Sequence, residues 1–198
     1  MRRILSMVVL LAGATYSVAQ AGPVNHTGGL IEAAVTYTPA YAKVSNTSCN
    51  CFWFQGGTVD VAIPLRGSLS VDFNVTGEHT TGLSGISMDK VDYLIGPRWS
   101  FDLFKKRESR HRSELFAEAL AGAVRGFNGI FPESSSSTTS ASSYAVQLGG
   151  GYDLALRSGV GLRLAEADYV RSGLPNNGSD TQNDLRLATG VYFRFGRR

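Results

Sequence analysis

The sequence predicts an all-β fold, an eight-stranded antiparallel up-and-down transmembrane β-barrel, and three observations lead to it. Several segments alternate between apolar and polar side chains with a period of two, which is typical of strands with two different faces. Beyond the N-terminal leader, no apolar run reaches the length of a membrane helix, so a membrane-embedded chain would have to form a closed barrel. The composition, with 23 Gly and only 18% charged residues, also favours strands and turns over helices.

The segment from Gln182 to Arg198 shows the alternating pattern against which we compare the others. From Leu185 to Phe195 one face is apolar and ends in two Phe, whereas the other face carries arginines and small residues. A strand that is apolar outside and polar or small inside is typical of outer-membrane barrels. We expect this strand to close the barrel by pairing with the segment Gly29–Tyr41, so that the sheet has no edge.

Seven further segments carry the pattern and bring the strand count to the even number that bacterial single-chain barrels have. They are residues 29–41, 52–65, 69–76, 90–101, 114–125, 144–154 and 160–170. The segment 114–125 also has a helical composition. We predict a strand there because Glu118 then shares a polar face with Gly122, and because the count of strands has to be even.

The connections between these strands alternate in length. Long polar loops are expected at residues 42–51, 77–89, 126–143 and 171–183, with short turns at 64–68 and 155–159 and a charged connection around 105–112. If both ends of the barrel domain lie in the periplasm, the four long loops are extracellular. Past Ala165 the alternation changes phase, so that Glu166 and Asp168 take the formerly apolar face, and we interpret this as a strand rising above the bilayer into water.

An export signal precedes the predicted barrel. Two arginines at positions 2 and 3 are followed by an apolar stretch over residues 4–14 and by small residues at Ser17–Ala19 or Ala19–Ala21. We therefore expect a signal peptide over residues 1–21 and an outer-membrane β-barrel domain over residues 22–198. A membrane-spanning anchor is the alternative, but it needs about 20 apolar residues and this run is shorter.

The charge balance bears on possible partners. Without the two arginines of the leader, 17 Lys and Arg remain against 16 Asp and Glu. This near neutrality gives no reason to expect nucleic acid as a partner.

The mature chain resembles the OmpA-like family of small, porin-like outer-membrane β-barrels. The matching segments are GGTVDVAIPL, QLGGGYDLAL, VGLRLAEADYV and NDLRLATGVYFRF. The resemblance implies an eight-stranded barrel in the outer membrane of a Gram-negative-type cell envelope, reached after signal-peptide export, with no cofactor and no metal. The partners it implies are outer-membrane lipids and, during biogenesis, the barrel-assembly machinery. The chain departs from the family at its end, where Phe195 is followed by Gly196-Arg197-Arg198.

The predicted inner face carries charges of both signs. An eight-stranded barrel has an interior just wide enough to be filled by side chains. We therefore expect these charges, with Lys90 among them, to pair across strands and to plug the lumen. The predicted lumen charge network comprises Glu32, Asp60, Asp72, Asp92, Arg98, Glu118, Asp153, Arg163, Arg186 and Arg194. The alternative is a soluble barrel with these charges outside and an apolar pocket within.

Aromatic residues gather towards the ends of the predicted outer face. Their amphipathic rings suit the two interfaces of a bilayer, which predicts an aromatic girdle. Its members are Tyr37, Tyr41, Trp53, Trp99, Phe101, Phe193 and Phe195.

Cys49 and Cys51 are the only 2 cysteines. Because export passes them through an oxidising compartment, a small, strained disulfide between them is possible. Free thiols and a soft-metal site that uses other ligands as well are the alternatives.

These patterns predict a structural or surface-interaction role and no enzymatic activity, with long loops presenting a surface of unknown ligand. One alternative is a soluble, secreted, lipocalin-like barrel that binds an apolar ligand. A third possibility is an outer-membrane lipid-modifying enzyme, which would need a His, a Ser and an acid at the outer rim. The predicted loop 77–89 contains His79, Glu78 and either Ser84 or Ser87, but these residues match no motif of such enzymes.

Overall fold

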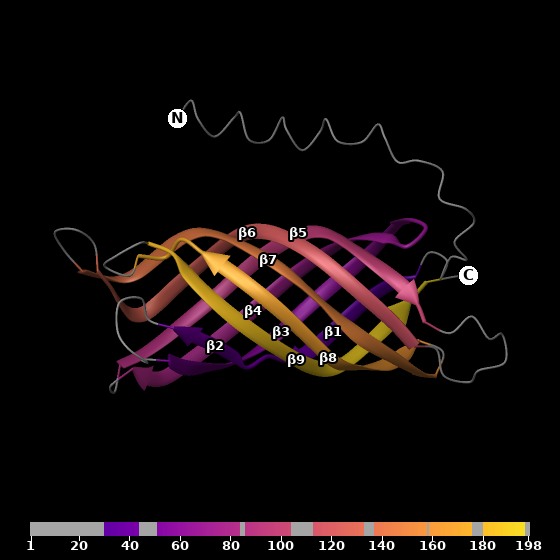
Figure 1. The fold of residues 1–198 in the computed structure, drawn as a ribbon, viewed down its shortest axis with the longest axis horizontal. Helices are drawn as coiled ribbons and strands as arrows, with labels where there is room; N and C mark the ends of the chain where they lie inside the picture. Colours follow the sequence, from indigo (N-terminus) through magenta and orange to yellow (C-terminus); the bar gives the residue numbers. More distant parts are fainter. Residues whose placement is uncertain are drawn as a thin grey trace, which may run out of the picture.

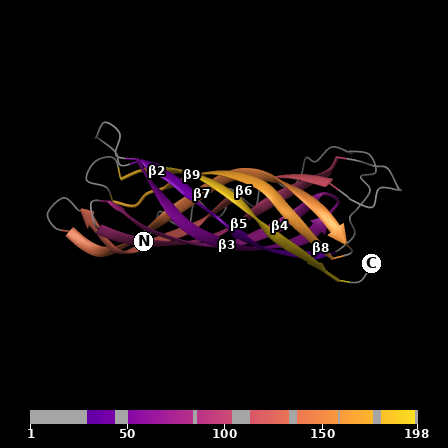
Figure 2. The same cartoon turned by 90° about the horizontal axis from the view of Figure 1, so that it is seen from below.

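The computed structural model describes residues 30–43, 51–83, 86–103, 113–132, 137–157, 159–175 and 180–196. These residues form a β-barrel whose strands are tilted around a long axis (Figures 1 and 2). Within them, no helix is long and apolar enough to cross a membrane. The strands are β1 (Ile31–Tyr37), β2 (Ala40–Lys43), β3 (Cys51–Arg66), β4 (Leu69–Leu83), β5 (Ile86–Asp102), β6 (Ser113–Pro132), β7 (Ser137–Arg157), β8 (Val160–Ser172) and β9 (Gln182–Phe195).

The sheet closes into a ring of eight antiparallel strands, in which β1 and β2 act as two halves of one strand. Pro39, which has no N–H to donate, separates the halves. The ladder continues across the break because Thr38 N donates to Gly56 O at 2.9 Å and Leu187 N donates to Pro39 O at 3.0 Å. The predicted fold class is therefore confirmed.

The closing pair is the predicted one. β9 pairs with the whole length of β1, with Glu32 opposite Arg194 and Val35 opposite Val191. The first part of β9 pairs with β2. We call the end of the barrel where β1 begins and β9 ends the terminal end, and the opposite end the loop end. A closed ring leaves no strand edge open for aggregation.

Two predicted loops are wrong, because most of their residues belong to strands. β4 and β5 extend the hairpin through residues 77–83 and 86–89, and β6 and β7 extend theirs through residues 126–132 and 137–143. In these extensions the inner face stays buried, as at Glu78, Met88 and Phe131, whereas outward residues such as His79 and Arg125 are polar. The alternation that marks a membrane strand then disappears from the sequence.

The interpretation of the end of β8 is also wrong. Tyr152 pairs with Ala165 but the next residue of β7 pairs with Arg163, so Leu164 is an extra residue in a β-bulge. Leu164 and Ala165 both face outward, and the alternation resumes with the opposite phase. Glu166 and Asp168 therefore return to the inside of the barrel, where they are 5% and 3% exposed.

Two glycines of β7 leave room inside the barrel. A Cβ at Gly151 would lie 2.7 Å from Phe116 Cζ and 2.7 Å from Ala165 O, and a Cβ at Gly149 would collide with the Asp168 carboxylate. The GGG run of β7 thus lets the large side chains of β6 and β8 occupy the lumen in front of it.

We expect Gly151→Ala to lower the free energy of unfolding by about 1–3 kcal/mol, because the added methyl overpacks the lumen against Phe116. Urea unfolding in lipid vesicles, followed by tryptophan fluorescence, measures this change.

The matched control is Gly77→Ala, whose Cβ would meet nothing within 4 Å. Alanine is favoured over glycine in a strand by about 0.5–1 kcal/mol, so this variant should be as stable as the native chain or more stable. Equal destabilisation by both variants would contradict the packing described for Gly151.

Candidate functional site

The candidate site is the lumen of the barrel, where charged side chains from all around the ring meet. The structure places every member of the predicted lumen charge network on the inner face of its strand. All are buried except Arg194 near the terminal end, whose side chain is 14% exposed.

Arg98 of β5 lies near the middle of this network. Its Nη2 donates to Glu32 Oε1 at 2.9 Å and to Asp153 Oδ2 at 3.1 Å. Its Nη1 lies 3.6 Å from Asp60 Oδ1 and 3.6 Å from Asp72 Oδ2. One guanidinium therefore draws together acids from β1, β3, β4 and β7.

Arg163 of β8 shares these acids. Its Nε lies 3.1 Å from Asp153 Oδ1, and its Nη2 lies 3.2 Å from Glu32 Oε1. Its Nη1 contacts Asp60 Oδ2 at 2.9 Å and Glu166 Oε2 at 3.1 Å. The planar fork of arginine presents five N–H donors, which suits this sharing among carboxylates.

The ring of Phe116 supports both guanidinium groups. Arg98 Cζ lies 3.7 Å and Arg163 Cζ 4.5 Å from the ring centroid, which is cation–π geometry. An aromatic ring inside an otherwise charged layer thus restrains the two arginines, and Gly151 provides the space for it.

A second ion-pair group lies closer to the loop end and centres on Arg186 of β9. Its Nε lies 2.7 Å from Glu78 Oε1 and its Nη2 lies 3.2 Å from Glu78 Oε2, which makes a bidentate ion pair across the lumen. Arg186 also pairs with Asp92, and its Nη1 donates to Gln147 Oε1 at 3.3 Å.

Lys90 of β5 completes this second group. Its Nζ lies 2.8 Å from Glu78 Oε2 and 2.5 Å from Asp184 Oδ2, and it sits 4.9 Å from the centroid of the Phe54 ring. At the terminal end, Arg194 forms a third group with Glu32 at 2.8 Å and Glu114 at 2.7 Å. Ion pairs thus occur at three levels along the barrel.

Several inward acids were missed by the sequence analysis. Glu78 was assigned to a loop, Glu166 and Asp168 were assigned to the outer face, and Glu114 and Asp184 were not assigned to the network. The bulge explains the second error and the length of β4 the first. Glu114 and Asp184 were detectable, because each lies an even number of residues from a predicted inward residue of its own strand.

A cluster of buried apolar side chains lies inside the barrel towards the loop end. We call this cluster the apolar stopper. It comprises Ala40, Ala42, Phe54, Met88, Leu94, Leu120, Val124, Phe131, Ala145 and Leu174. Phe131 reaches it after a register irregularity that includes Asn128 at φ 56°, and its ring packs over Gly126.

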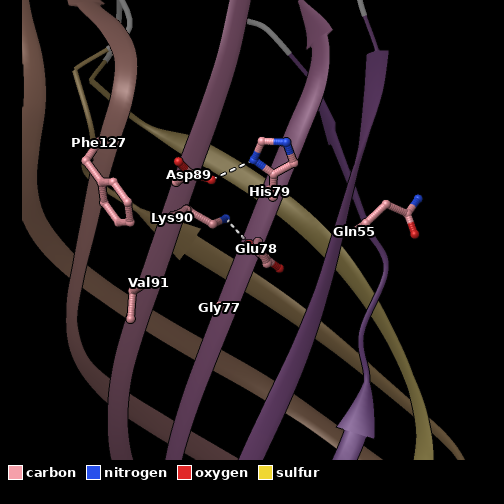
Figure 3. Close-up of a pocket in the computed structure, with 8 residues that line it drawn as sticks. All are labelled: Gln55, Gly77, Glu78, His79, Asp89, Lys90, Val91 and Phe127. Atoms are coloured by element: carbon pink, nitrogen blue, oxygen red, sulfur yellow. Dashed lines mark hydrogen bonds and ion pairs between the residues drawn. The ribbon is translucent and has the colours of Figure 1, made fainter.

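A shallow pocket lies near the loop end between β3, β4, β5 and β6 (Figure 3). In it His79 Nδ1 lies 2.6 Å from Asp89 Oδ1, and Asn128 Nδ2 donates to Asp89 Oδ2 at 2.5 Å. His79 is thus a strand residue and not a loop residue, and in the described part of the chain no serine hydroxyl is bonded to it. Ser84 lies outside the described residues.

All members of the predicted aromatic girdle are exposed on the outer face of the barrel. Tyr41 and Trp53 form a tilted pair with centroids 5.2 Å apart, and Phe193 and Phe195 stack at 6.3 Å. The outer face also exposes aromatic side chains that the predicted girdle leaves out, namely Phe73, Tyr93, Tyr144 and Tyr169. The predicted disulfide stays a prediction, because Cys49 lies outside the described residues. The predicted signal peptide over residues 1–21 lies outside them as well.

No protein-family model matches the chain, and no curated protein matches it. Among solved structures, the chain resembles Neisserial surface protein A (NspA), with a TM-score of 0.59 and 17% identity over 83% of this chain and 97% of that one. It also resembles Ail, the attachment invasion locus protein of Yersinia pestis, solved in complex with the heparin analogue sucrose octasulfate. That match has a TM-score of 0.53 and 15% identity over 84% of this chain and 99% of Ail. The likeness shows the fold, that of the eight-stranded outer-membrane barrels of the OmpA-like type, and confirms the resemblance predicted from the strand patterns.

We expect Arg98→Met to lower the free energy of unfolding by about 3–5 kcal/mol, because it leaves buried carboxylates without their shared cation. Arg66→Met, on an exposed arginine where β3 ends, should change it by less than about 0.5 kcal/mol. Urea unfolding of both refolded variants gives the comparison. Similar values for the two would show that the central ion pairs do not stabilise the barrel.

Proposed function

We propose that the protein is an integral outer-membrane β-barrel with a closed lumen and a structural or surface-interaction role. In this arrangement the loop end faces the exterior and the terminal end faces the periplasm. The observation that carries the proposal is the polarity of the barrel wall, which is apolar outside and charged inside.

The outer face supports the membrane location. Large apolar side chains such as Val35, Val59, Phe73, Ile95 and Leu148 are 44–62% exposed on neighbouring strands around the ring. Burial of one such side chain is worth about 1.5–3 kcal/mol, and lipid would supply that burial for the whole belt. Aromatic side chains towards both ends of the belt suit the bilayer interfaces.

The loop end supports an exterior surface. Above the apolar belt the outward residues of the same strands become polar, as at His79, Asp89, Arg125 and Arg171. The hairpins β4–β5 and β6–β7 therefore extend past the belt as paired strands. Such rigid hairpins are suited to present a surface to a partner outside the cell.

The lumen supports a barrel that does not conduct freely. Ion pairs occur at three levels along the lumen, and the apolar stopper lies at its loop end. A ring of eight strands has an interior just wide enough to be filled by side chains. Export through a signal peptide over residues 1–21 is part of the same proposal, as is delivery by the barrel-assembly machinery.

The other two candidates receive less support. A lipocalin-like barrel needs an apolar interior and a polar exterior, the reverse of the faces seen here. For a lipid-modifying enzyme, the His79–Asp89 pair is the one favourable feature, but a hydroxyl nucleophile on His79 is lacking among the described residues.

We expect the protein, expressed with its leader in a Gram-negative host, to fractionate with the outer membrane and to change its gel mobility on heating. Ile95→Arg should then destabilise the barrel in lipid by about 2–4 kcal/mol, because it places a charge near the bilayer midplane. Unfolding from lipid vesicles measures this difference.

The control for that substitution is Thr81→Arg, on the outer face of β4 beyond the apolar belt, which should be neutral. A freely soluble protein, or an Ile95→Arg variant as stable as Thr81→Arg, would contradict the membrane location.

A further inference from the structure

The described lumen holds more acids than bases. Its buried acids are the eleven residues Glu32, Asp60, Asp72, Glu78, Asp92, Glu114, Glu118, Asp153, Glu166, Asp168 and Asp184. Against them stand five bases, Lys90, Arg98, Arg163 and Arg186, with Arg194 at the terminal end. The buried acids therefore outnumber the side-chain cations by six. Buried carboxylates without a compensating positive charge are costly, so this excess has to be neutralised by protons or by a bound cation.

The excess is concentrated at one place. One carboxylate oxygen from each of Glu118, Glu166 and Asp168 lies within 4.8 Å of the others, and all three residues are buried. Gln147 donates to Glu118 at 2.9 Å and Arg163 contacts Glu166 at 3.1 Å. Asp168 has no ion pair with any described residue, and its Oδ1 has no hydrogen-bond partner.

A fourth carboxylate lies beside these three. Asp72 of β4 is 0% exposed and lies within hydrogen-bond reach of the Glu118 carboxyl, but no N–H or hydroxyl donor of the described residues reaches its oxygens. Its contact with Arg98 is 3.6 Å long. Two neighbouring acids of this kind cannot both stay ionised unless a cation binds between them, and otherwise one of them keeps a proton.

The backbone of β7 allows the carboxylates to gather in one place. Glu118 and Asp168 stand on either side of Gly149 in the same row of the sheet, and Phe116 and Glu166 stand on either side of Gly151. Because the glycines carry no side chain, the carboxylates of β6 and β8 approach one another over β7. The Asp168 carboxylate occupies the space in front of Gly149, where a Cβ would collide with it.

We propose that Glu118, Glu166 and Asp168, with Asp72 beside them, bind one hard divalent cation of the calcium type. Ca²⁺ takes oxygen ligands at about 2.3–2.6 Å, so two oxygens on opposite sides of one ion are at most about 5 Å apart. The 4.8 Å limit of the cluster falls within that span. Mg²⁺, with ligands at about 2.0–2.1 Å in an octahedron, would require a closer set. The ion links β6 to β8 across β7 and offsets two of the excess negative charges.

Equilibrium dialysis of the refolded, chelator-treated full chain against radioactive Ca²⁺ tests the site. We expect one Ca²⁺ per barrel, and at least a tenfold weaker affinity in Asp168→Asn, which removes a ligand without breaking an ion pair. Glu118→Gln should weaken binding likewise. The matched control is Glu114→Gln, which removes a buried acid paired with Arg194 far from the cluster and should leave the affinity unchanged.

Thermal unfolding separates an ion ligand from a merely structural acid. A chelator should lower the melting temperature of the native chain and leave that of Asp168→Asn unchanged. In chelator, Asp168→Asn should be at least as stable as the native chain, since it relieves repulsion within the cluster. The proposal is overturned if the folded native chain binds no stoichiometric Ca²⁺, or if Asp168→Asn retains native affinity. Dialysis measures Ca²⁺ binding and not the membrane location, so a failure of the calcium site would not be a failure of the proposed function.

Discussion

The structure depends on the pairing of charges that have been taken out of water. Moving an ion into a low-dielectric interior costs several kcal/mol, and partners in good geometry have to offset that cost. Arg98 and Arg163 meet this requirement only because β1, β3, β4, β7 and β8 each place an acid at the same level of the barrel. A slip of one residue in any strand would turn its acid outward and leave an arginine unpaired. The ion pairs of the lumen therefore require one particular register for each strand.

The same constraint explains features that look unrelated in the sequence. The glycine run of β7 is needed because Phe116 and Asp168 occupy the space in front of it. The bulge at Leu164 restores the inward phase of β8 so that Glu166 reaches Arg163 at 3.1 Å. The outer face carries no such demand for specific pairs, and its side chains need only be apolar. Specific side-chain pairing in this barrel thus occurs in the lumen, whereas the outer face only has to be apolar.

Much of this fold could be predicted from alternation alone, because a strand with an apolar outer side and a charged lumen side has two different faces. The pairing of Glu32 with Arg194 followed from closing the ring with the first and last strands. Glu166 and Asp168 could not be placed, since a bulge changes the phase without changing the residue types. Phe54 was missed because an apolar side chain facing inward contradicts the general rule for such barrels, and Phe131 because residues 126–143 were predicted to form a loop. The hairpin extensions at the loop end were missed for a third reason, namely that outward polar residues such as His79 and Arg125 remove the contrast between the two faces.

The central claim, that packed and paired side chains close the lumen, is tested most directly by electrical recording from the purified, refolded protein in planar bilayers. A general porin serves as the positive control for insertion and recording. The ion pairs at three levels and the apolar stopper predict that inserted barrels carry no large steady current. A large, steady conductance in most insertions of the folded protein would show that a continuous water-filled path exists, and it would contradict the account.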